Sequence, residues 1–359
     1  MLLRTLRNSL YLSILLTAVA SAAPPNAALY RVTDLGAVGR TNVAWSLNQV
    51  GDVAGWSRFD DGTSEGFLYS SGMLDYVGFI GGTSVSNVAA VNNLGHGIGT
   101  SGTTHEDRRA FIWNGNHRTN LGTLGGDHSQ GNGINDLDQA VGWSKLADNF
   151  STRAFIWDDG VMSALPTLGG EQASARWINN AGTIVGTSTD DPNSLQQYGV
   201  VWQDGLIAPL PPFGEANVPY YIHENGNIAG FARLPDLGGK TRGVIWHNGE
   251  IVLTLGTLAD GTPFEGSASS VAYGINDRGV IVGMSINATG DGYVPFVSRH
   301  GVMIQLDDLM PEPWVATNVG PGAINDAGQI AVEAVNGDGT SHALLLTPRI
   351  QLSRIAERK

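Results

Sequence analysis

Residues 133–170 read GINDLDQAVGWSKLADNFSTRAFIWDDGVMSALPTLGG, and this stretch predicts the local structure of the whole chain. It contains four short segments rich in β-branched or aromatic residues, separated by stretches that contain Gly, Asn or Asp. That alternation of short apolar segments and turn residues is typical of an antiparallel meander. The four strands are expected at residues 133–135, 139–144, 153–157 and 161–165.

The same unit recurs seven times, with a spacing of about 44 residues. Its clearest mark is Ile-Asn-x-x-Gly followed by two aliphatic residues and often by Gly. A period of about 40–50 residues that contains hairpin turns predicts a closed array of repeats rather than a two-layer domain. The anchors of the copies are Leu47-Asn48, Val91-Asn92, Ile134-Asn135, Ile178-Asn179, Ile222-His223, Ile275-Asn276 and Ile324-Asn325.

The recurring residues have structural explanations. Asn-x-x-Gly predicts a type I turn in which the Asn side chain bonds back to the backbone and Gly takes the left-handed conformation. The third strand of each copy carries large apolar residues, such as Phe111-Ile112-Trp113 and Phe155-Ile156-Trp157. We expect them to fill the space between neighbouring sheets, because large aromatic side chains are usually buried.

These patterns predict an all-β fold, a seven-bladed β-propeller with four antiparallel strands per blade. The chain ends bear on closure of the ring. Residues 30–36 have the pattern of a fourth strand with no three strands before it, and no fourth strand follows residues 321–346, where the last three strands are expected. We therefore expect the N-terminal strand to complete the last blade. An open solenoid is the alternative, but it leaves two exposed sheet edges.

The first residues have the features of an export signal. Arg4 and Arg7 precede an apolar stretch at residues 10–20, and Ala20-Ser21-Ala22 matches a cleavage site. We expect a signal peptide at residues 1–22, a single propeller domain at 23–348 and a C-terminal tail at 349–359. The apolar stretch is about half the length of a membrane-spanning helix, so an uncleaved anchor is the less favoured alternative. The expected location is secreted or periplasmic.

Composition limits the partners. The chain has 33 acidic and 20 basic residues, a net charge of −13, and no cysteine. An acidic chain without a basic patch repels phosphate backbones and anionic membranes, so nucleic acid is not an expected partner. The fold must be stable without disulfide bonds. We expect no membrane span in the mature chain, and a monomer.

The chain resembles the HAF-repeat family of bacterial exported proteins over about residues 29–348. The resemblance rests on LGTLGG at residues 121–126, on the Ile-Asn-x-x-Gly turns and on Arg-Ala-Phe-Ile-Trp at residues 153–157. The His-Ala-Phe tripeptide that gives the family its name is imperfect here. His342-Ala343-Leu344 keeps the His, whereas Arg109 and Arg153 replace it in other copies. The resemblance implies export and a repeat fold, and it implies no particular reaction.

Loops between the second and third strands carry most of the variable acidic residues. A ring of these carboxylates at the channel mouth is one interpretation, since it suits a cation or a polyhydroxylated ligand. Solvated turns that keep an exported protein soluble are the favoured interpretation, because Asp beside Gly is common in turns. The carboxylates are Asp60, Asp61, Glu106, Asp107, Asp148, Asp190, Asp191, Asp236, Asp291 and Asp338.

Two longer loops break the period and supply the candidate ligand-binding residues. One contains Asp260 and Phe264, the other Trp314, and the two loops precede the sixth and seventh copies. Their position predicts that both aromatic rings reach the same face, as in a sugar-binding or peptide-binding site. In the alternative interpretation both rings fold inward and cover the last blades.

No sequence motif indicates catalysis. The chain lacks Gly-x-Ser-x-Gly, His-Glu-x-x-His and a cysteine nucleophile. His105, His128 and His342 lie in loops without metal-ligand spacing, so we expect no metal and no cofactor. The preferred hypothesis is a non-enzymatic binding or scaffold module whose partner is an extracellular glycan or protein. The alternative is a hydrolase or lyase that acts on polysaccharide or peptide through loop carboxylates.

Overall fold

The computed structural model describes residues 28–81, 84–102, 107–212, 215–259, 269–290 and 292–349. Within these ranges the chain forms 28 strands and two short 3₁₀ helices, so the expected all-β class is confirmed. The expected signal peptide and all of the expected tail except Arg349 lie outside the described residues. Among the described residues, no helix has the length and hydropathy needed to span a membrane.

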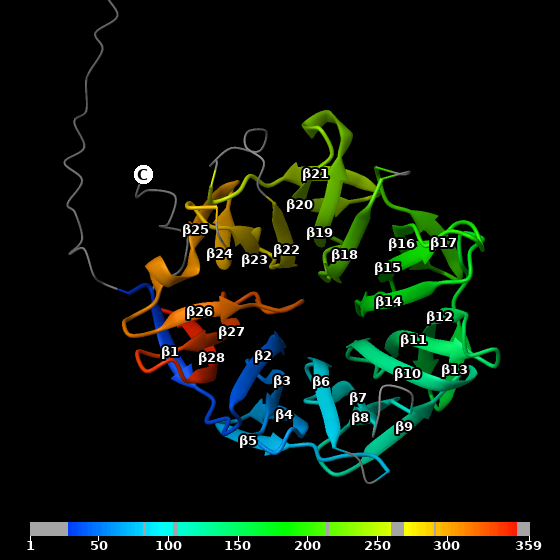
Figure 1. Cartoon of the computed structure of the whole chain (residues 1–359), viewed down its shortest axis with the longest axis horizontal. Helices are drawn as coiled ribbons and strands as arrows, with labels where there is room; N and C mark the ends of the chain where they lie inside the picture. Colours follow the sequence, from blue (N-terminus) through cyan, green and yellow to red (C-terminus); the bar gives the residue numbers. More distant parts are fainter. Residues whose placement is uncertain are drawn as a thin grey trace, which may run out of the picture.

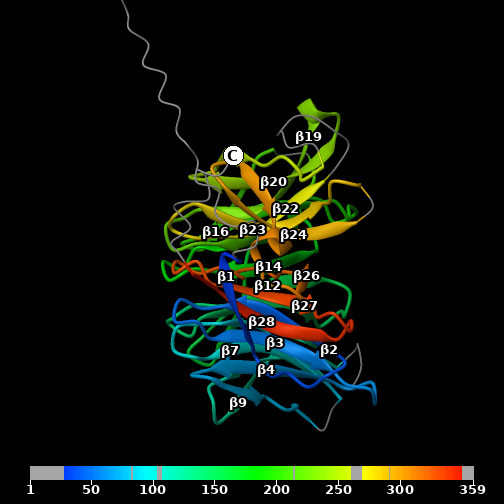
Figure 2. The same cartoon turned by 90° about the vertical axis from the view of Figure 1, so that its left-hand side faces the viewer.

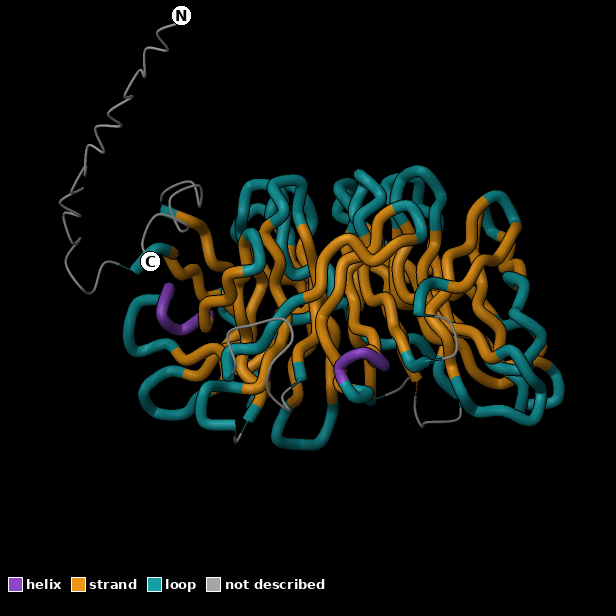
Figure 3. The backbone as a smooth tube through the Cα atoms, turned by 90° about the horizontal axis from the view of Figure 1, so that it is seen from above, coloured by secondary structure: helices purple, strands orange, loops and turns teal. Residues whose placement is uncertain are grey.

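The strands are arranged as meanders around a common centre, with the first strand of each meander innermost (Figure 1). Turns and loops gather on the two opposite faces of the strand layer (Figure 3). The first two meanders are β2 (Thr41–Leu47), β3 (Val53–Arg58), β4 (Ser64–Ser70) and β5 (Met73–Tyr76), then β6 (Val85–Val91), β7 (Gly97–Gly102), β8 (Arg109–Trp113) and β9 (Arg118–Gly122). The next two are β10 (Gly125–Ile134), β11 (Ala140–Leu146), β12 (Thr152–Asp158) and β13 (Val161–Ala164), then β14 (Ala173–Ile178), β15 (Ile184–Thr189), β16 (Gln197–Gln203) and β17 (Leu206–Pro209).

The second half of the chain continues in the same way, with one 3₁₀ helix in each of two connections. It contains β18 (Asn217–Ile222), β19 (Ile228–Leu234), η1 (Pro235–Leu237), β20 (Lys240–His247) and β21 (Glu250–Thr254), then β22 (Ser270–Ile275), β23 (Val280–Ile286), β24 (Tyr293–Arg299) and β25 (Val302–Gln305). The last elements are η2 (Leu306–Leu309), β26 (Val315–Asn318), β27 (Ile330–Val335) and β28 (Ser341–Pro348).

Hydrogen bonding divides the described strands into five sheets of four strands and one larger sheet. The larger sheet contains the first two meanders, β2–β5 and β6–β9, which are linked by a single parallel pair, Ser64 with Val85. Within each meander all pairs are antiparallel, as the turn pattern predicts.

The N-terminal strand closes the last sheet. β1 (Tyr30–Asp34) pairs antiparallel with β28, from Tyr30 opposite Pro348 to Asp34 opposite Leu344. The two strands lie side by side in both views (Figures 1 and 2). The backbone bond from Leu35 N to Ala343 O, 3.0 Å, extends the pairing. The sequence-based prediction that the first strand completes the last sheet is confirmed by this pairing.

Two strand boundaries differ from expectation. The first strand of the third unit is β10, which begins at Gly125 and not near residue 133, because a Gly-rich run of low β-propensity still pairs with β11. The first strand of the last unit is β26, which ends at Asn318, whereas the sequence predicted the strands of this unit from residue 321 onward. The second strands of the other units carry a Gly at the position of Val332 in β27. Because Val332 replaces this Gly, β26 stops pairing with β27 after Asn318. Proline, which lacks a backbone donor, follows in that segment.

The recurring turn forms as predicted. In the first copy, Asn48 Oδ1 accepts the backbone N–H groups of Val50 and Asp52 at 3.1 and 2.8 Å, and Gly51 has φ of +96°. In the third copy Asp138 takes the left-handed position instead, with φ of +60°. The Asn side chain therefore satisfies backbone donors that the tight turn leaves unpaired.

Most of the same Asn residues also link neighbouring units, which the sequence did not indicate. Five of the six motif Asn residues donate their side-chain Nδ2–H to the backbone carbonyl of the corresponding Asn in the next unit. These bonds are Asn48 to Asn92 at 2.7 Å, Asn92 to Asn135 at 2.9 Å, Asn135 to Asn179 at 3.1 Å, Asn276 to Asn325 at 3.1 Å and Asn325 to Asn48 at 3.1 Å. The last bond joins the last unit to the first, so the side-chain contacts follow the closure of the ring.

The aromatic residues of the third strands form the core between sheets, as expected. Phe67, Phe111, Phe155 and Phe296 are completely buried, and Trp246 is too. Each benzyl side chain removes a large apolar area from water, and this burial holds adjacent sheets together.

Candidate functional site at the centre of the strands

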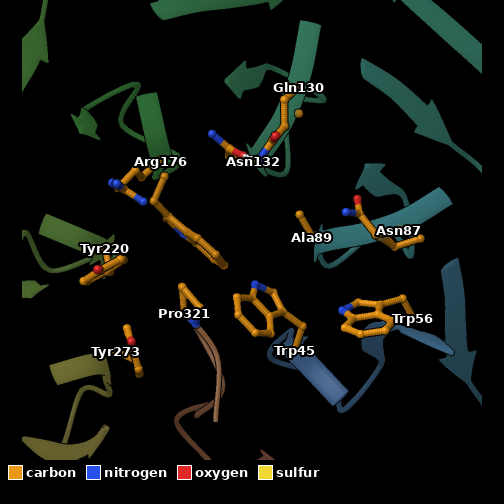
Figure 4. A pocket seen from close by; sticks show the side chains of 13 residues that line it. Trp45, Trp56, Asn87, Ala89, Gln130, Asn132, Arg176, Tyr220, Tyr273 and Pro321 are labelled. Atoms are coloured by element: carbon orange, nitrogen blue, oxygen red, sulfur yellow. Dashed lines mark hydrogen bonds between the residues drawn. The ribbon is translucent and has the colours of Figure 1, made fainter. Parts of the chain in front are cut away.

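A cavity of about 410 Å³ lies where the innermost strands meet (Figure 4). This volume falls within the range of about 300–1,000 Å³ usual for small-molecule sites. The cavity is lined by Trp45, Trp56, Asn87, Val88, Ala89, Gln130, Gly131, Asn132, Arg176, Trp177, Tyr220, Tyr273 and Pro321.

A β-bulge in each innermost strand supplies most of this lining. In β2, Ala44 pairs with Gly55 and Ser46 pairs with Ala54, so Trp45 is an extra residue without a partner in β3. A bulge redirects the side chain of its extra residue and is common beside functional sites. The bulge residues that line the cavity are Trp45 in β2, Ala89 in β6, Asn132 in β10, Arg176 in β14, Tyr220 in β18 and Tyr273 in β22.

The Gly of the repeated motif makes room for the bulge. A Cβ atom on Gly55 would overlap the backbone oxygen of Val43, and one on Gly186 would overlap that of Ser174. Only a residue without a side chain allows the first and second strands to approach this closely. The aliphatic-aliphatic-Gly pattern thus fixes the place where one side chain per unit turns inward.

Glycines of the last unit make room for two aromatic rings. A Cβ atom on Gly320 would lie 2.8 Å from Cδ2 of Trp45, and one on Gly322 would overlap the indole of Trp177. Gly322 stands three residues before Asn325, the position that carries the bulge side chain in other units. At this position the last unit therefore leaves room for the indole of Trp177, whereas the other units place a side chain there.

Arg176 is the single charged side chain among the described residues that line the cavity. Its Cζ atom lies 4.9 Å from the centroid of the Tyr220 ring, a distance that allows cation–π attraction. Within the described part of the chain it makes no hydrogen bond or ion pair, and its Nε is buried without a partner. Burial lowers the pKa of Arg176, partly opposed by Tyr220 and Tyr273, yet a guanidinium stays protonated in proteins.

Two phenols stand beside this cation. The rings of Tyr220 and Tyr273 meet edge to face, with centroids 4.9 Å apart and an angle of 75°. Burial and, to a smaller extent, the neighbouring Tyr220 raise the pKa of Tyr273 to about 12, although Arg176 opposes the shift. Tyr273 is therefore neutral at physiological pH and is suited to donate a hydrogen bond rather than to remove a proton.

Three side-chain amides complete the polar wall. Gln130 Nε2 donates to Asn132 Oδ1 at 3.0 Å, and Asn132 Nδ2 donates to the backbone oxygen of Ala175 at 2.7 Å. Asn87 Oδ1 accepts the N–H of Thr100 at 3.1 Å. With respect to the described residues, Gln130 Oε1 and Asn87 Nδ2 keep free hydrogen-bonding capacity, so the cavity can both donate to and accept from a ligand.

Carboxylates gather at the recurring turns instead of in the cavity. Asp136, Glu224 and Asp326 each follow a motif Asn or His and accept a backbone N–H of the preceding unit, at 2.7, 2.9 and 2.8 Å. Burial raises the pKa of Glu224, the Asn180 N–H lowers it, and Asp136 raises it. Across the described ranges, no group of three or more His, Asp or Glu is placed to hold a metal ion.

Of the residues predicted from sequence to bind a ligand, Trp314 alone is described, while Asp260 and Phe264 lie outside the described residues. Trp314 is half-buried and meets the ring of His342 edge-on, with centroids 5.0 Å apart and an angle of 80°. His342 Nδ1 lies 2.8 Å from Asp34 Oδ2 beside the closing pair of strands. Trp314 is thus placed at the closure, and it does not line the central cavity.

Several loop carboxylates bond within their own turns. Asp61 accepts from Thr63, Asp148 from Ser151 and Asp338 from Thr340, and these hydrogen bonds lower the pKa of each carboxyl. This geometry supports the interpretation of these three residues as solvated turn residues. Glu106 and Asp291 lie outside the described residues.

The cavity residues were not identified from the sequence, although a signal was present. Three residues before each motif Asn or His, the seven copies carry six different residue types: Trp45, Ala89, Asn132, Arg176, Tyr220, Tyr273 and Gly322. A position that varies among copies with a common fold is free of the structural demands on its neighbours. Aligning the copies on the Asn residue isolates this position.

No protein-family model matches the chain, and no curated protein sequence does so either. Solved structures do match. One is the β-propeller domain of the Trilobed protease from Pyrococcus furiosus, described as having an open velcro topology, with 14% identity, a TM-score of 0.52 and coverage of 74% of this chain and 84% of that one. Another is a puromycin-hydrolyzing peptidase of Mycobacterium tuberculosis, with 10% identity, a TM-score of 0.51 and coverage of 90% of this chain and 51% of that one. This chain therefore spans about half of that peptidase. At such identities the similarity shows a β-propeller fold and nothing about activity.

Proposed function

We propose that the chain is an exported, non-enzymatic, seven-bladed β-propeller that binds a small polar ligand, most simply part of an extracellular glycan, in its central cavity. One observation carries this proposal. Bulges at equivalent positions turn a Trp, an Asn, an Arg and two Tyr side chains into one space, and the repeat itself requires none of these residue types. A concave site with aromatic walls and a few convergent polar groups is suited to ligand binding.

The blade count follows from how the largest sheet is divided. A single parallel pair links β4 to β6, whereas each of the two meanders in that sheet is joined internally by several antiparallel pairs. Counting them as two blades gives seven, in agreement with the seven copies of the motif in the sequence. The Asn bond from Asn325 to Asn48 supports a closed ring.

Export and family membership are part of the proposal. They rest on the leader at residues 1–22 and on the HAF-repeat resemblance of the LGTLGG and Ile-Asn-x-x-Gly segments. A monomer is proposed on the closed arrangement, in which β1 covers the edge of β28. The site around Asp260, Phe264 and Trp314 stays a prediction for a second contact surface.

Binding is preferred to catalysis because of the cavity's chemistry. Among the described residues that line it, none is Asp, Glu, His, Lys or Ser, and Tyr273 has a pKa near 12. General acid–base catalysis works best with groups that titrate near the operating pH. A hydrolase that uses paired carboxylates has no such pair among these lining residues.

The proposal is tested on a glycan array with the wild-type chain and Ala89→Trp. Ala89 lines the cavity and is half-buried, so a larger side chain there fills the space from the bulge position that carries Trp in β2. Leu94→Ala, at a side chain that is 57% exposed in a turn, is the matched control. We expect glycan binding by the wild type and the control, and its loss in Ala89→Trp with an unchanged melting temperature.

If Ala89→Trp binds the glycan as well as the wild type does, the binding site lies outside this cavity. No binding by the wild type to any glycan rejects the glycan as ligand.

A further inference from the structure

We infer that the ligand of this cavity carries a carboxylate, and that it is an acidic sugar whose uronate group binds Arg176. The inference rests on the proposed function and names the class of ligand. The structural basis is an unpaired guanidinium in a cavity that is also lined by three indoles, two phenols and three amides (Figure 4).

The charge of Arg176 has no counterpart among the described residues of the cavity. Tyr220 and Tyr273 are the titratable groups that influence its pKa besides burial. Removing a guanidinium from water without an acceptor destabilises the folded chain. A chain with 33 acidic residues has many carboxylates, yet none of the described ones lines this space. An anionic ligand supplies the missing partner.

A carboxylate fits this site better than a phosphate does. A guanidinium presents a planar fork that bonds both oxygens of a carboxylate. Phosphate sites usually combine several cationic or backbone donors, whereas Arg176 is the sole cation of the described lining.

The remaining walls favour a sugar over an apolar acid. Trp45 and Trp56 offer flat apolar surfaces to the C–H face of a pyranose ring, and Figure 4 shows both indoles at the cavity. Gln130 Oε1 and Asn87 Nδ2 have unused hydrogen-bonding capacity towards the described residues, and hydroxyl groups satisfy both a donor and an acceptor. A ligand without hydroxyls leaves these polar groups unpaired and binds more weakly.

The test uses digalacturonate and its neutral methyl ester, which differ in the charge of the carboxyl groups. Binding is followed by tryptophan fluorescence, because Trp45 and Trp56 line the site, and by calorimetry. We expect the acid to bind the wild type about tenfold to a hundredfold more tightly than the ester, the effect of hydrogen bonds to a charged group. Arg176→Gln is expected to bind both compounds equally, and Arg176→Lys to recover only part of the preference.

Arg278→Gln is the matched control. Arg278 is 45% exposed, lies 3.7 Å from Asp277 and does not line the cavity. Its replacement is expected to leave the preference for the acid unchanged. If Arg278→Gln removes the preference as Arg176→Gln does, the effect is long-range charge and the inference is overturned.

The outcomes separate the inference from the proposed function. Equal binding of acid and ester by the wild type overturns carboxylate recognition and leaves glycan binding intact. Binding of a peptide with a free C-terminal carboxylate, without binding of either sugar, overturns the sugar class and the glycan proposal. Release of an unsaturated uronate from digalacturonate shows a lyase and overturns the non-enzymatic assignment.

Discussion

Asn325 Nδ2 donates to the backbone oxygen of Asn48 at 3.1 Å, although 277 residues separate them in the sequence. Asn48 in turn donates to Asn92, and the series continues through Asn135 to Asn179. Both Asn residues are buried and also satisfy their own turns. The bond between them is the side-chain counterpart of the backbone pairing between β1 and β28.

Replacing Asn325 by Ala removes this bond and the acceptor of the Gln329 N–H. We expect a loss of about 1–3 kcal/mol in the free energy of unfolding, because buried donors and acceptors are left unsatisfied. Urea unfolding measures the change. Asn93→Ala, in an exposed turn residue, is the control, and an equal effect of both variants contradicts a special role at the closure.

Deleting residues 23–36 removes β1 and exposes the edge of β28. We expect cooperative thermal unfolding to be lost, because the last sheet then has three strands and an unprotected edge. Adding a peptide of residues 28–36 in trans is expected to restore part of the transition. An unchanged melting temperature after the deletion shows that ring closure does not depend on β1.

Gly186→Ala tests the bulge that places Arg176. The new Cβ overlaps the Ser174 oxygen, so we expect destabilisation of about 1–3 kcal/mol from overpacking. Gly292→Ala is the matched control, because a Cβ atom there would have no heavy atom of the described residues within 4 Å and its φ does not require Gly. Equal stability of the two variants in thermal unfolding contradicts the close approach of β14 and β15.

Arg176→Gln is expected to raise the stability of the ligand-free chain. It removes a half-buried charge that has no partner among the described residues, and we expect a gain of about 0.5–2 kcal/mol, the size that single stabilising substitutions commonly reach. Differential scanning calorimetry without ligand measures it. A lower melting temperature shows that Arg176 stabilises the fold through its cation–π contact with Tyr220, and this result contradicts a role in ligand binding alone.

The pH dependence of stability is expected to include Glu224. Burial raises its pKa in the folded chain above the ordinary value of 4.5, so the folded state binds more protons than the unfolded state in that window. Stability from this group is present below pH 4.5 and falls as pH rises through the folded pKa. Glu224→Gln is expected to flatten the pH profile above pH 4.5.

Asp61→Asn is the control, because the pKa of Asp61 is shifted in the direction opposite to that of Glu224. Hydrogen bonds from Thr63 lower the pKa of Asp61, so its contribution is lost as pH falls through the folded pKa. If Glu224→Gln and Asp61→Asn change the unfolding profile in the same direction, the assignment of Glu224 is wrong.

The repeat, the all-β class, the Asn-x-x-Gly turns and the pairing of the N-terminal strand with the last one could all be predicted from the sequence. These features depend on residues close in the chain and on a period of about 44 residues, so composition and spacing are enough to predict them. The predicted position of the first strand of the last unit was wrong, and this error also has a local cause, because Val332 replaces the expected Gly.

The cavity, in contrast, emerges from the folded ring. Trp45 and Arg176 line the same cavity because a one-residue bulge in β2 and another in β14 turn both side chains towards the centre. A register shift of this kind leaves no mark in hydrophobic periodicity, and convergence of strands far apart in the chain depends on ring closure. The lack of a charged partner for Arg176 likewise depends on all the residues that surround it, and these residues come from separate segments of the sequence.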